Sequence, residues 1–281
     1  MSVSTQRFVD PFLVIHRFES PHIDGGEGVN SYIIETSNCL IILDLPLLDS
    51  VAKNIREYAD QLQKPIKKVF ITHAHPDHWF GLYRFKDFES FSTPKTIDEI
   101  KNLGSQYLDF KRSSLGGDDA DLPPEVIVPN NAVETFDETI DGVRFSWKLI
   151  SNVEFLEGLY LIFDQHKIFM AGDLVYNGVH HYVGQRDDSG SLCVTNWIDF
   201  LSSLEASSFN YVYAGHGPNA GFELIGSSVD YLKCVRDIIT DPQKSRVDYR
   251  DFVNTRFPEH KVSEMIDISD FFVYGPPDSN S

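Results

Sequence analysis

The amino-acid sequence predicts an α/β fold of two sheet-and-helix halves packed as one domain. Short apolar or β-branched runs typical of strands occur in two batches, and a segment with helical spacing of apolar residues closes each batch. The 281 residues are 42% apolar and 23% charged, which is typical of a globular protein with a sizeable core. These observations favour a single domain over residues 1–281.

In the first batch, three predicted strands come before one amphipathic helix and one comes after it. Apolar residues recur at helical spacing behind an Asp or Ser cap in residues 47–63, at Leu48, Val51, Ile55, Tyr58 and Leu62. The strands are the runs FLVIHRF, NSYIIET and CLIILDL before this helix and KKVFIT after it. Residues 81–88 are predicted to be helical.

The second batch begins after a segment of different character. Residues 94–125 contain a predicted helix that opens at Pro94 and then a polar loop, and we interpret them as an insertion. The following runs are predicted strands: 125–129, 132–136, 143–150, 158–163 and 167–172. A helix over 196–206 precedes a last strand over 209–215, and about 226–271 is predicted to be a helical C-terminal extension.

Charge and composition limit the partners and the location that we expect. The formal net charge of −18 would repel phosphate backbones, so nucleic acid is not an expected partner, and a small-molecule substrate is. Three cysteines without CxxC spacing suit a reducing compartment, and no apolar run approaches the ~20 residues of a membrane helix. We therefore expect a cytoplasmic protein without membrane contact, and a homodimer through the C-terminal helices stays open.

The motif HAHPDH is the strongest indication of chemistry. It follows the predicted strand KKVFIT, at the kind of strand end where α/β enzymes keep functional residues. His73 and His75 are two apart and would project on the same side of a strand, so both could bind one ion. Asp77 and His78 lie just beyond and could bind a second ion. Imidazole is the commonest side-chain ligand for zinc and also suits iron.

Two further candidate ligands follow buried strands. The run KIFMAG leads into Asp173, and FNYVYAG leads into His216. A small Ala-Gly pair precedes each residue, so the backbone can come close to its neighbours there. A carboxylate between two cations can bridge them, and water bound there becomes a nucleophile near neutral pH.

These motifs, HAHPDH, AGD and GHGP in this order, resemble the metallo-β-lactamase superfamily. The resemblance implies a four-layer αββα sandwich of two mixed β-sheets flanked by helices, with metal at one edge. It implies that His73 and His75 bind one metal, that Asp77, His78 and His216 bind the other, and that Asp173 bridges them. Asp44 resembles an acid that orients a ligand imidazole through its other nitrogen.

The sequence departs from the family pattern at the third motif. The family has a histidine about 20 residues before the bridging acid, whereas this chain has Glu154 there. Glu154 can supply an oxygen ligand, which would add negative charge and could favour iron or manganese over zinc. Alternatively, Glu154 is not a ligand and one metal position is weak or empty.

The predicted function is that of a metal-dependent hydrolase. A hydroxide held by two zinc ions would attack a small ester, lactone, thioester or related substrate. Asp77, Asp173 and His180 are the candidate catalytic residues, and the segment after Asp173 is expected to line the pocket. The alternatives are an iron-dependent oxygenase of the same superfamily, with a single metal, and a non-catalytic protein with a degenerate metal site.

Overall fold

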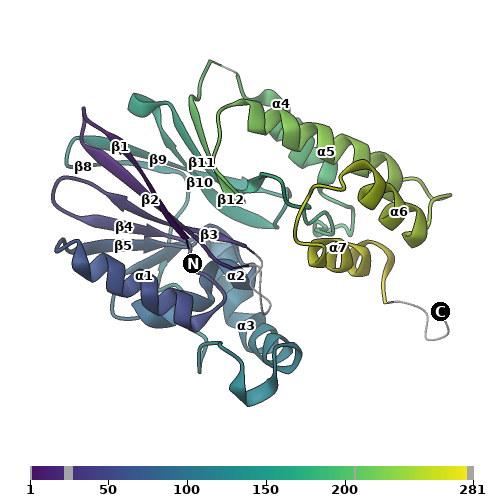
Figure 1. Ribbon diagram of the computed structural model, residues 1–281, viewed down its shortest axis with the longest axis horizontal. Coiled ribbons are helices and arrows are strands. Elements are labelled where there is room, and N and C mark those ends of the chain that lie inside the picture. Colours follow the sequence, from purple (N-terminus) through teal and green to yellow (C-terminus); the bar gives the residue numbers. More distant parts are fainter. Residues whose placement is uncertain (1, 22–27, 206, 277–281) are drawn as a thin grey trace. The chain divides into compact units, whose positions relative to one another are not determined.

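Two mixed β-sheets flanked by helices form the framework of the protein, as predicted (Figure 1). The computed structural model describes residues 2–21, 28–205 and 207–276. The chain divides into two compact units. The first unit comprises Met1–Ile150 and Glu157–Met170, and the second comprises Ser151–Leu156 and Ala171–Ser281.

The first sheet contains seven strands in chain order. Its first four strands pair antiparallel, and β4 to β7 pair parallel. The strands β2, β3 and β4 are mostly buried, which accounts for the apolar runs LVI, YII and LIIL in this part of the sequence. The strands are β1 (Ser2–Phe8), β2 (Leu13–Glu19), β3 (Asn30–Glu35), β4 (Leu40–Leu43), β5 (Ile66–Phe70), β6 (Ser90–Ser92) and β7 (Asn131–Ala132).

The second sheet contains five strands in the order β12-β11-β10-β9-β8. Asp141 and Gly142, with φ of 51° and 82°, form the tight turn of the β8–β9 hairpin, and Asp-Gly is a favoured pair for such a turn. The strand β11 begins in the first unit and ends in the second. The strands are β8 (Phe136–Ile140), β9 (Val143–Ser151), β10 (Glu157–Phe163), β11 (Ile168–Tyr176) and β12 (Tyr211–His216).

Within the first unit, aromatic side chains join the two sheets and helices cover the outer face of the first sheet. Phe70 of β5 stacks on Trp147 of β9, with ring centroids 3.8 Å apart. The helix α1 (Asp49–Gln61) turns an apolar stripe inward, and its Tyr58 packs edge-on against Phe18 of β2. The helix α3 (Pro94–Ser114) begins as predicted, and its cap Thr93 accepts a hydrogen bond from the Thr96 amide.

Within the second unit, the helix α4 (Val194–Ser203) packs on β11, where the Trp197 indole donates to the Leu174 carbonyl over 3.0 Å. Figure 1 shows α4 and α5 (Glu223–Ile239) side by side. The helices α6 (Arg246–Arg256) and α7 (Glu264–Tyr274) follow, so the helical character predicted over 226–271 is confirmed. Interpreting this segment as an extension, and 94–125 as an insertion, stays a prediction.

Four local predictions were wrong. The strand predicted over 132–136 is not continuous, because β7 ends at Ala132 and β8 begins at Phe136 in the other sheet. The strand β1 was missed because its sequence, SVSTQRF, is polar and mostly exposed, and it pairs only with β2. Residues 125–129 form no strand, since three neighbouring prolines remove the backbone donors that a sheet needs. Residues 81–88 are not an α-helix: the four-residue helix α2 (Pro76–Trp79) leads into a 3₁₀ helix, Phe80–Phe85. Residue 206 of the predicted helix 196–206 lies outside the described residues.

The described helices are all unsuited to a membrane-spanning role. In residues 2–21, 28–205 and 207–276, no helix combines the necessary length with sufficient apolar character.

Replacement of Trp147 tests the contact between the sheets. Trp147→Ala should lower the free energy of unfolding by about 3–5 kcal/mol, because a cavity would open beside Phe70. Trp147→Phe should cost much less, because its ring still stacks and the lost indole N–H has no hydrogen-bond partner among the described residues. Urea denaturation measures both, with exposed Phe110→Ala as the control. Equal losses for the two Trp147 variants would contradict the stacking argument.

Candidate metal centre

In the first unit, the turn after β5 gathers four candidate ligands. His75 caps the short helix α2 and Pro76 occupies its first turn, so the chain bends sharply within the motif. The ring centroids of His73 and His75 are 4.6 Å apart, and those of His73 and His78 are 4.2 Å apart. His73, Asp77 and His78 are buried, whereas His75 is half-buried. The structure therefore brings the predicted residues of this motif together.

Asp44 orients both buried imidazoles of this group. Its Oδ2 lies 2.9 Å from Nδ1 of His78 and 2.8 Å from the hydroxyl of Thr72, which in turn lies 2.9 Å from Nδ1 of His73. An ionised carboxylate only accepts, so His78 donates from Nδ1 and the Thr72 hydroxyl donates to Asp44. That hydroxyl then accepts from Nδ1 of His73. Both imidazoles therefore carry their proton on Nδ1, and Nε2 of each is the basic nitrogen that a metal binds.

The backbone of Asp44 explains how its carboxylate reaches this position. Asp44 follows β4 with φ of 56°, a left-handed conformation that aspartate tolerates better than most residues. Its amide donates to the Phe70 carbonyl, and its Oδ1 accepts from the Thr72 amide over 2.7 Å. The predicted contact between Asp44 and an imidazole of the motif is confirmed, and Thr72 is a further polar residue that sequence reasoning missed.

In the second unit, three candidate ligands lie on separate elements. Glu154 lies in the loop between β9 and β10, Asp173 lies within β11, and His216 ends β12. Nε2 of His216 is 3.2 Å from Oδ2 of Asp173, and a carboxylate oxygen of Glu154 lies within 4.8 Å of one of Asp173. All three residues are buried. The contacts within this unit therefore place Glu154 beside the predicted bridging acid.

The small residue before His216 is required by the close approach of β12 to Asp173. A Cβ atom added to Gly215 would lie 1.8 Å from Oδ1 of Asp173 and 2.7 Å from the backbone carbon of Gly172. Real atoms do not approach so closely, so only glycine fits at Gly215. This confirms the expectation that the Ala-Gly pair before His216 allows a close backbone approach.

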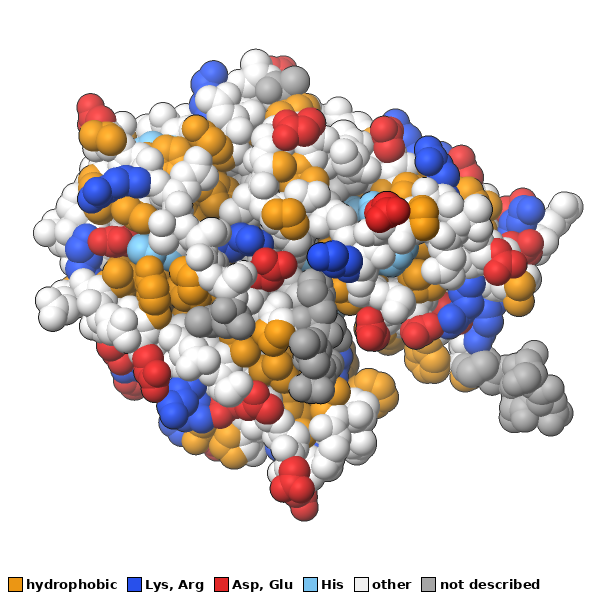
Figure 2. Space-filling view, in the orientation of Figure 1, with side chains coloured by type: hydrophobic (Ala, Val, Ile, Leu, Met, Phe, Trp, Pro, Cys, Tyr) orange, Lys and Arg blue, Asp and Glu red, His pale blue; other side chains and the backbone are white. Residues whose placement is uncertain are grey.

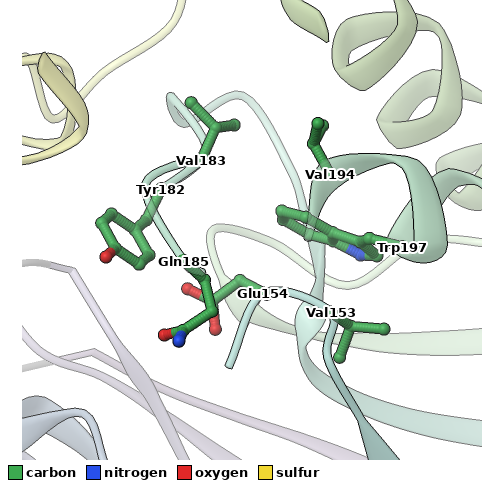
Figure 3. Close-up of a pocket in the computed structure, with 7 residues that line it drawn as sticks. All are labelled: Val153, Glu154, Tyr182, Val183, Gln185, Val194 and Trp197. Atoms are coloured by element: carbon green, nitrogen blue, oxygen red, sulfur yellow. The ribbon is translucent and has the colours of Figure 1, made fainter. Parts of the chain in front are cut away.

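Glu154 also borders a narrow apolar pocket of the second unit. Figure 3 shows its carboxylate and the Gln185 amide at the same end of the pocket, with the Trp197 ring on another side. The remaining lining residues are Val153, Tyr182, Val183 and Val194. The space between these side chains is too small for a water molecule, so this side of Glu154 is dry. A dry surrounding strengthens every electrostatic contact of the carboxylate.

His180, the predicted catalytic histidine, packs in an aromatic group rather than against the second-unit ligands. Its Nδ1 lies 3.3 Å from the Tyr231 hydroxyl, and its ring lies 5.4 Å from that of His260. Burial, with a smaller contribution from His260, lowers the pKa of His180 to about 4, so it is neutral at pH 7. The next residue, His181, stacks on Tyr176, and burial lowers its pKa well below the usual value. A catalytic role for His180 stays a prediction.

Comparisons with known proteins agree with this fold and these motifs. The profile of the metallo-beta-lactamase superfamily matches residues 24–216, and the chain belongs to this superfamily. Its fold is similar to that of a metallo-beta-lactamase from Pontibacter korlensis, with 14% identity, TM-score 0.58, and coverage of 83% of this chain and 99% of that one. FIM-1 from Pseudomonas aeruginosa, solved in its mono-zinc form, has 15% identity, TM-score 0.58, and coverages of 83% and 96%.

A short part of the chain is similar to a curated protein. It is 43% identical over 56 residues to ribonuclease Z from Picrophilus torridus. The match covers 16% of this chain and only 18% of that protein's length.

The donor types in both units, imidazole nitrogens and carboxylate oxygens, fit the metals that we expect, which are zinc, iron and manganese.

Replacement of Asp44 tests whether its hydrogen bonds prepare the imidazoles. Asp44→Asn should weaken metal binding about 10–100-fold, because the amide is a poorer acceptor for His78 and Thr72. The matched control is Asp141→Asn, since Asp141 also has positive φ and also accepts from a threonine hydroxyl and a backbone amide. Competition with a chromogenic chelator measures the affinity. An equal loss in both variants would refute a specific role for Asp44.

Replacement of Gly215 tests the close approach of β12 to Asp173. Gly215→Ala should lower both bound metal and thermal stability, because the new Cβ displaces Asp173. The control is Gly226→Ala in α5, where an added Cβ meets nothing within 4 Å and should stabilise the helix by about 0.5–1 kcal/mol. Elemental analysis and thermal unfolding provide the two readouts. Normal metal content in Gly215→Ala would argue against Asp173 as a ligand.

Proposed function

We propose that the protein is a metal-dependent hydrolase of small esters, lactones, thioesters or related substrates. Membership of the superfamily supports a hydrolase, and the donor types support zinc, with two ions. The proposed ligands are His73, His75, Asp77 and His78 from the first unit and Glu154, Asp173 and His216 from the second. The single observation that carries the proposal is the hydrogen-bonded chain through which Asp44 and Thr72 turn Nε2 of His73 and His78 into ligand atoms.

The chain's own residues have distinct parts in this proposal. Bound metal ions would activate a water molecule and stabilise the oxyanion that forms on the substrate. Asp44 keeps the protons of His73 and His78 on Nδ1 during turnover, directly or through Thr72, and so raises the basicity of Nε2 on both rings. The predicted catalytic role of His180 stays a hypothesis that its pKa does not support, because a pKa of about 4 makes the imidazole a weak base at neutral pH.

The surface charge favours a small substrate over a polyanion. The net charge of −18 opposes the approach of nucleic acid. On the face seen in Figure 2, basic side chains are interspersed with acidic ones and form no continuous basic stripe. We therefore also propose that the protein binds no nucleic acid.

One observation favours a second candidate function, hydrolysis of a phosphodiester. It is the 56-residue similarity to ribonuclease Z, at 43% identity. The same metal chemistry serves a phosphorus centre and a carbonyl carbon. A small phosphodiester therefore belongs in the substrate panel.

Metal analysis and a substrate panel test the proposal together. The purified chain should contain zinc, and it should hydrolyse at least one of a chromogenic ester, lactone, thioester, β-lactam and phosphodiester. His75→Ala should lose metal and more than about 100-fold in activity, because losing a ligand exceeds the 10–100-fold cost of losing an outer partner. The control His166→Ala removes a histidine whose Nε2 contacts the Pro11 carbonyl, and it should change neither quantity.

Three outcomes would count against the hydrolase. A chain that binds no metal under zinc, iron or manganese supplementation refutes it. A single tightly bound iron, without hydrolysis, favours the oxygenase alternative. Unchanged metal content and stability in His75→Ala favour a degenerate site.

A further inference from the structure

The hydroxyl of Tyr176 contacts the carboxylates of both Glu154 and Asp173 in the second unit. Tyr176 ends β11, three residues after Asp173, and is buried. Its hydroxyl oxygen is 3.0 Å from Oε1 of Glu154 and 2.9 Å from Oδ2 of Asp173. One side chain thus contacts both acidic residues that we propose as ligands in this unit.

The ring of Tyr176 is held by contacts within the second unit. It is stacked on His216, with ring centroids 4.9 Å apart and planes 6° apart, and on His181, with centroids 4.6 Å apart. Ser228 of α5 contacts the backbone of Tyr176, and its hydroxyl also lies 3.1 Å from Nε2 of His181. These contacts fix where the hydroxyl lies before any ligand binds.

The hydroxyl reduces the electrostatic repulsion between the carboxylates of Glu154 and Asp173. Two buried carboxylates within a few ångströms repel each other, and an imidazole at this position would not cause that repulsion. A phenol proton can be donated to either carboxylate, and it stabilises their charge without adding a positive charge. The pocket beside Glu154 is dry, so water does not provide this compensation from that side.

We infer that Tyr176 is a positioning residue that makes Glu154 a metal ligand in place of the family's usual histidine. The inference rests on the proposed metal centre. A carboxylate can bind a cation through one oxygen or through two, whereas an imidazole binds through one nitrogen. Donation from Tyr176 to Oε1 of Glu154 competes with two-oxygen binding and so favours single-oxygen coordination, as four-coordinate zinc requires.

The test is metal affinity in variants that lack a single buried hydroxyl. Tyr176→Phe keeps the stacked ring and removes only the donor, so its zinc affinity should fall about 10–100-fold. Its preference for zinc over manganese should also fall, because manganese accepts higher oxygen coordination. The control Tyr249→Phe removes a buried hydroxyl of α6 and should leave both quantities unchanged. Chelator competition with each metal measures affinity independently of activity.

A double-mutant cycle shows whether Tyr176 acts through Glu154. In a Glu154→Gln background, the further change Tyr176→Phe should cost clearly less zinc affinity than it does in the wild-type background, because the charged acceptor at Glu154 is gone and only the donation to Asp173 remains. An equal cost in both backgrounds would overturn the inference and assign Tyr176 a general structural role. Circular dichroism and thermal melts of the metal-free variants check folding. If Tyr176→Phe does not fold, Glu154→Asp withdraws the carboxylate from an intact Tyr176 and should give the same 10–100-fold loss.

The experiment separates this inference from the proposed function. A wild-type chain that binds zinc, together with a Tyr176→Phe variant of unchanged affinity, overturns the inference alone. A wild-type chain that binds none of the metals overturns the proposed function and this inference with it.

Discussion

Much of this structure depends on one constraint, which is that the negative charge of each buried carboxylate must be stabilised by a hydrogen-bond donor or a cation. Asp44, Glu154 and Asp173 are each at most 2% exposed, and an ionised carboxylate at such a position requires hydrogen-bond donors or a cation. At Asp44 the donors are the Thr72 amide, the Thr72 hydroxyl and His78, so one side chain ties the end of β4 to the turn after β5 and to α2. The same hydrogen bonds that allow burial also set the tautomer of each imidazole, so stability and metal chemistry are coupled there.

The two units bring their candidate ligands together in different ways. In the first unit the candidate ligands come from one turn, and a local sequence motif supplies both the imidazoles and, through Pro76, the bend that gathers them. In the second unit Glu154, Asp173 and His216 come from distant parts of the chain, and strand packing brings them together. Gly215 has no polar side chain, yet no other residue fits there because β12 passes so close to Asp173.

This difference explains how much the sequence predicted. The motif from His73 to His78 and the contact of Asp44 could be predicted, because they depend on short spacings and on a family resemblance. Asp173 and His216 were recognisable because each comes after a buried apolar run and an Ala-Gly pair, although Asp173 lies within β11 and not beyond its end. The hydrogen bonds of Tyr176 could not be predicted, since residues three apart on a regular strand project to opposite sides. Its reach to Asp173 depends on the length of the phenol, and its reach to Glu154 depends on the β9–β10 loop.

Glu154 and Tyr176 are best understood as a coupled pair. A glutamate alone at the third motif would place a second buried negative charge beside Asp173, and two such charges repel each other. A tyrosine alone at the end of β11 would bury a hydroxyl beside a single acid. With both residues present, the one hydroxyl proton of Tyr176 can be donated to Glu154 or to Asp173, and stacking of the ring on His216 keeps this donor beside both carboxylates. The departure from the family pattern at Glu154 is therefore compatible with a working metal site, because the Tyr176 hydroxyl beside it stabilises the added negative charge.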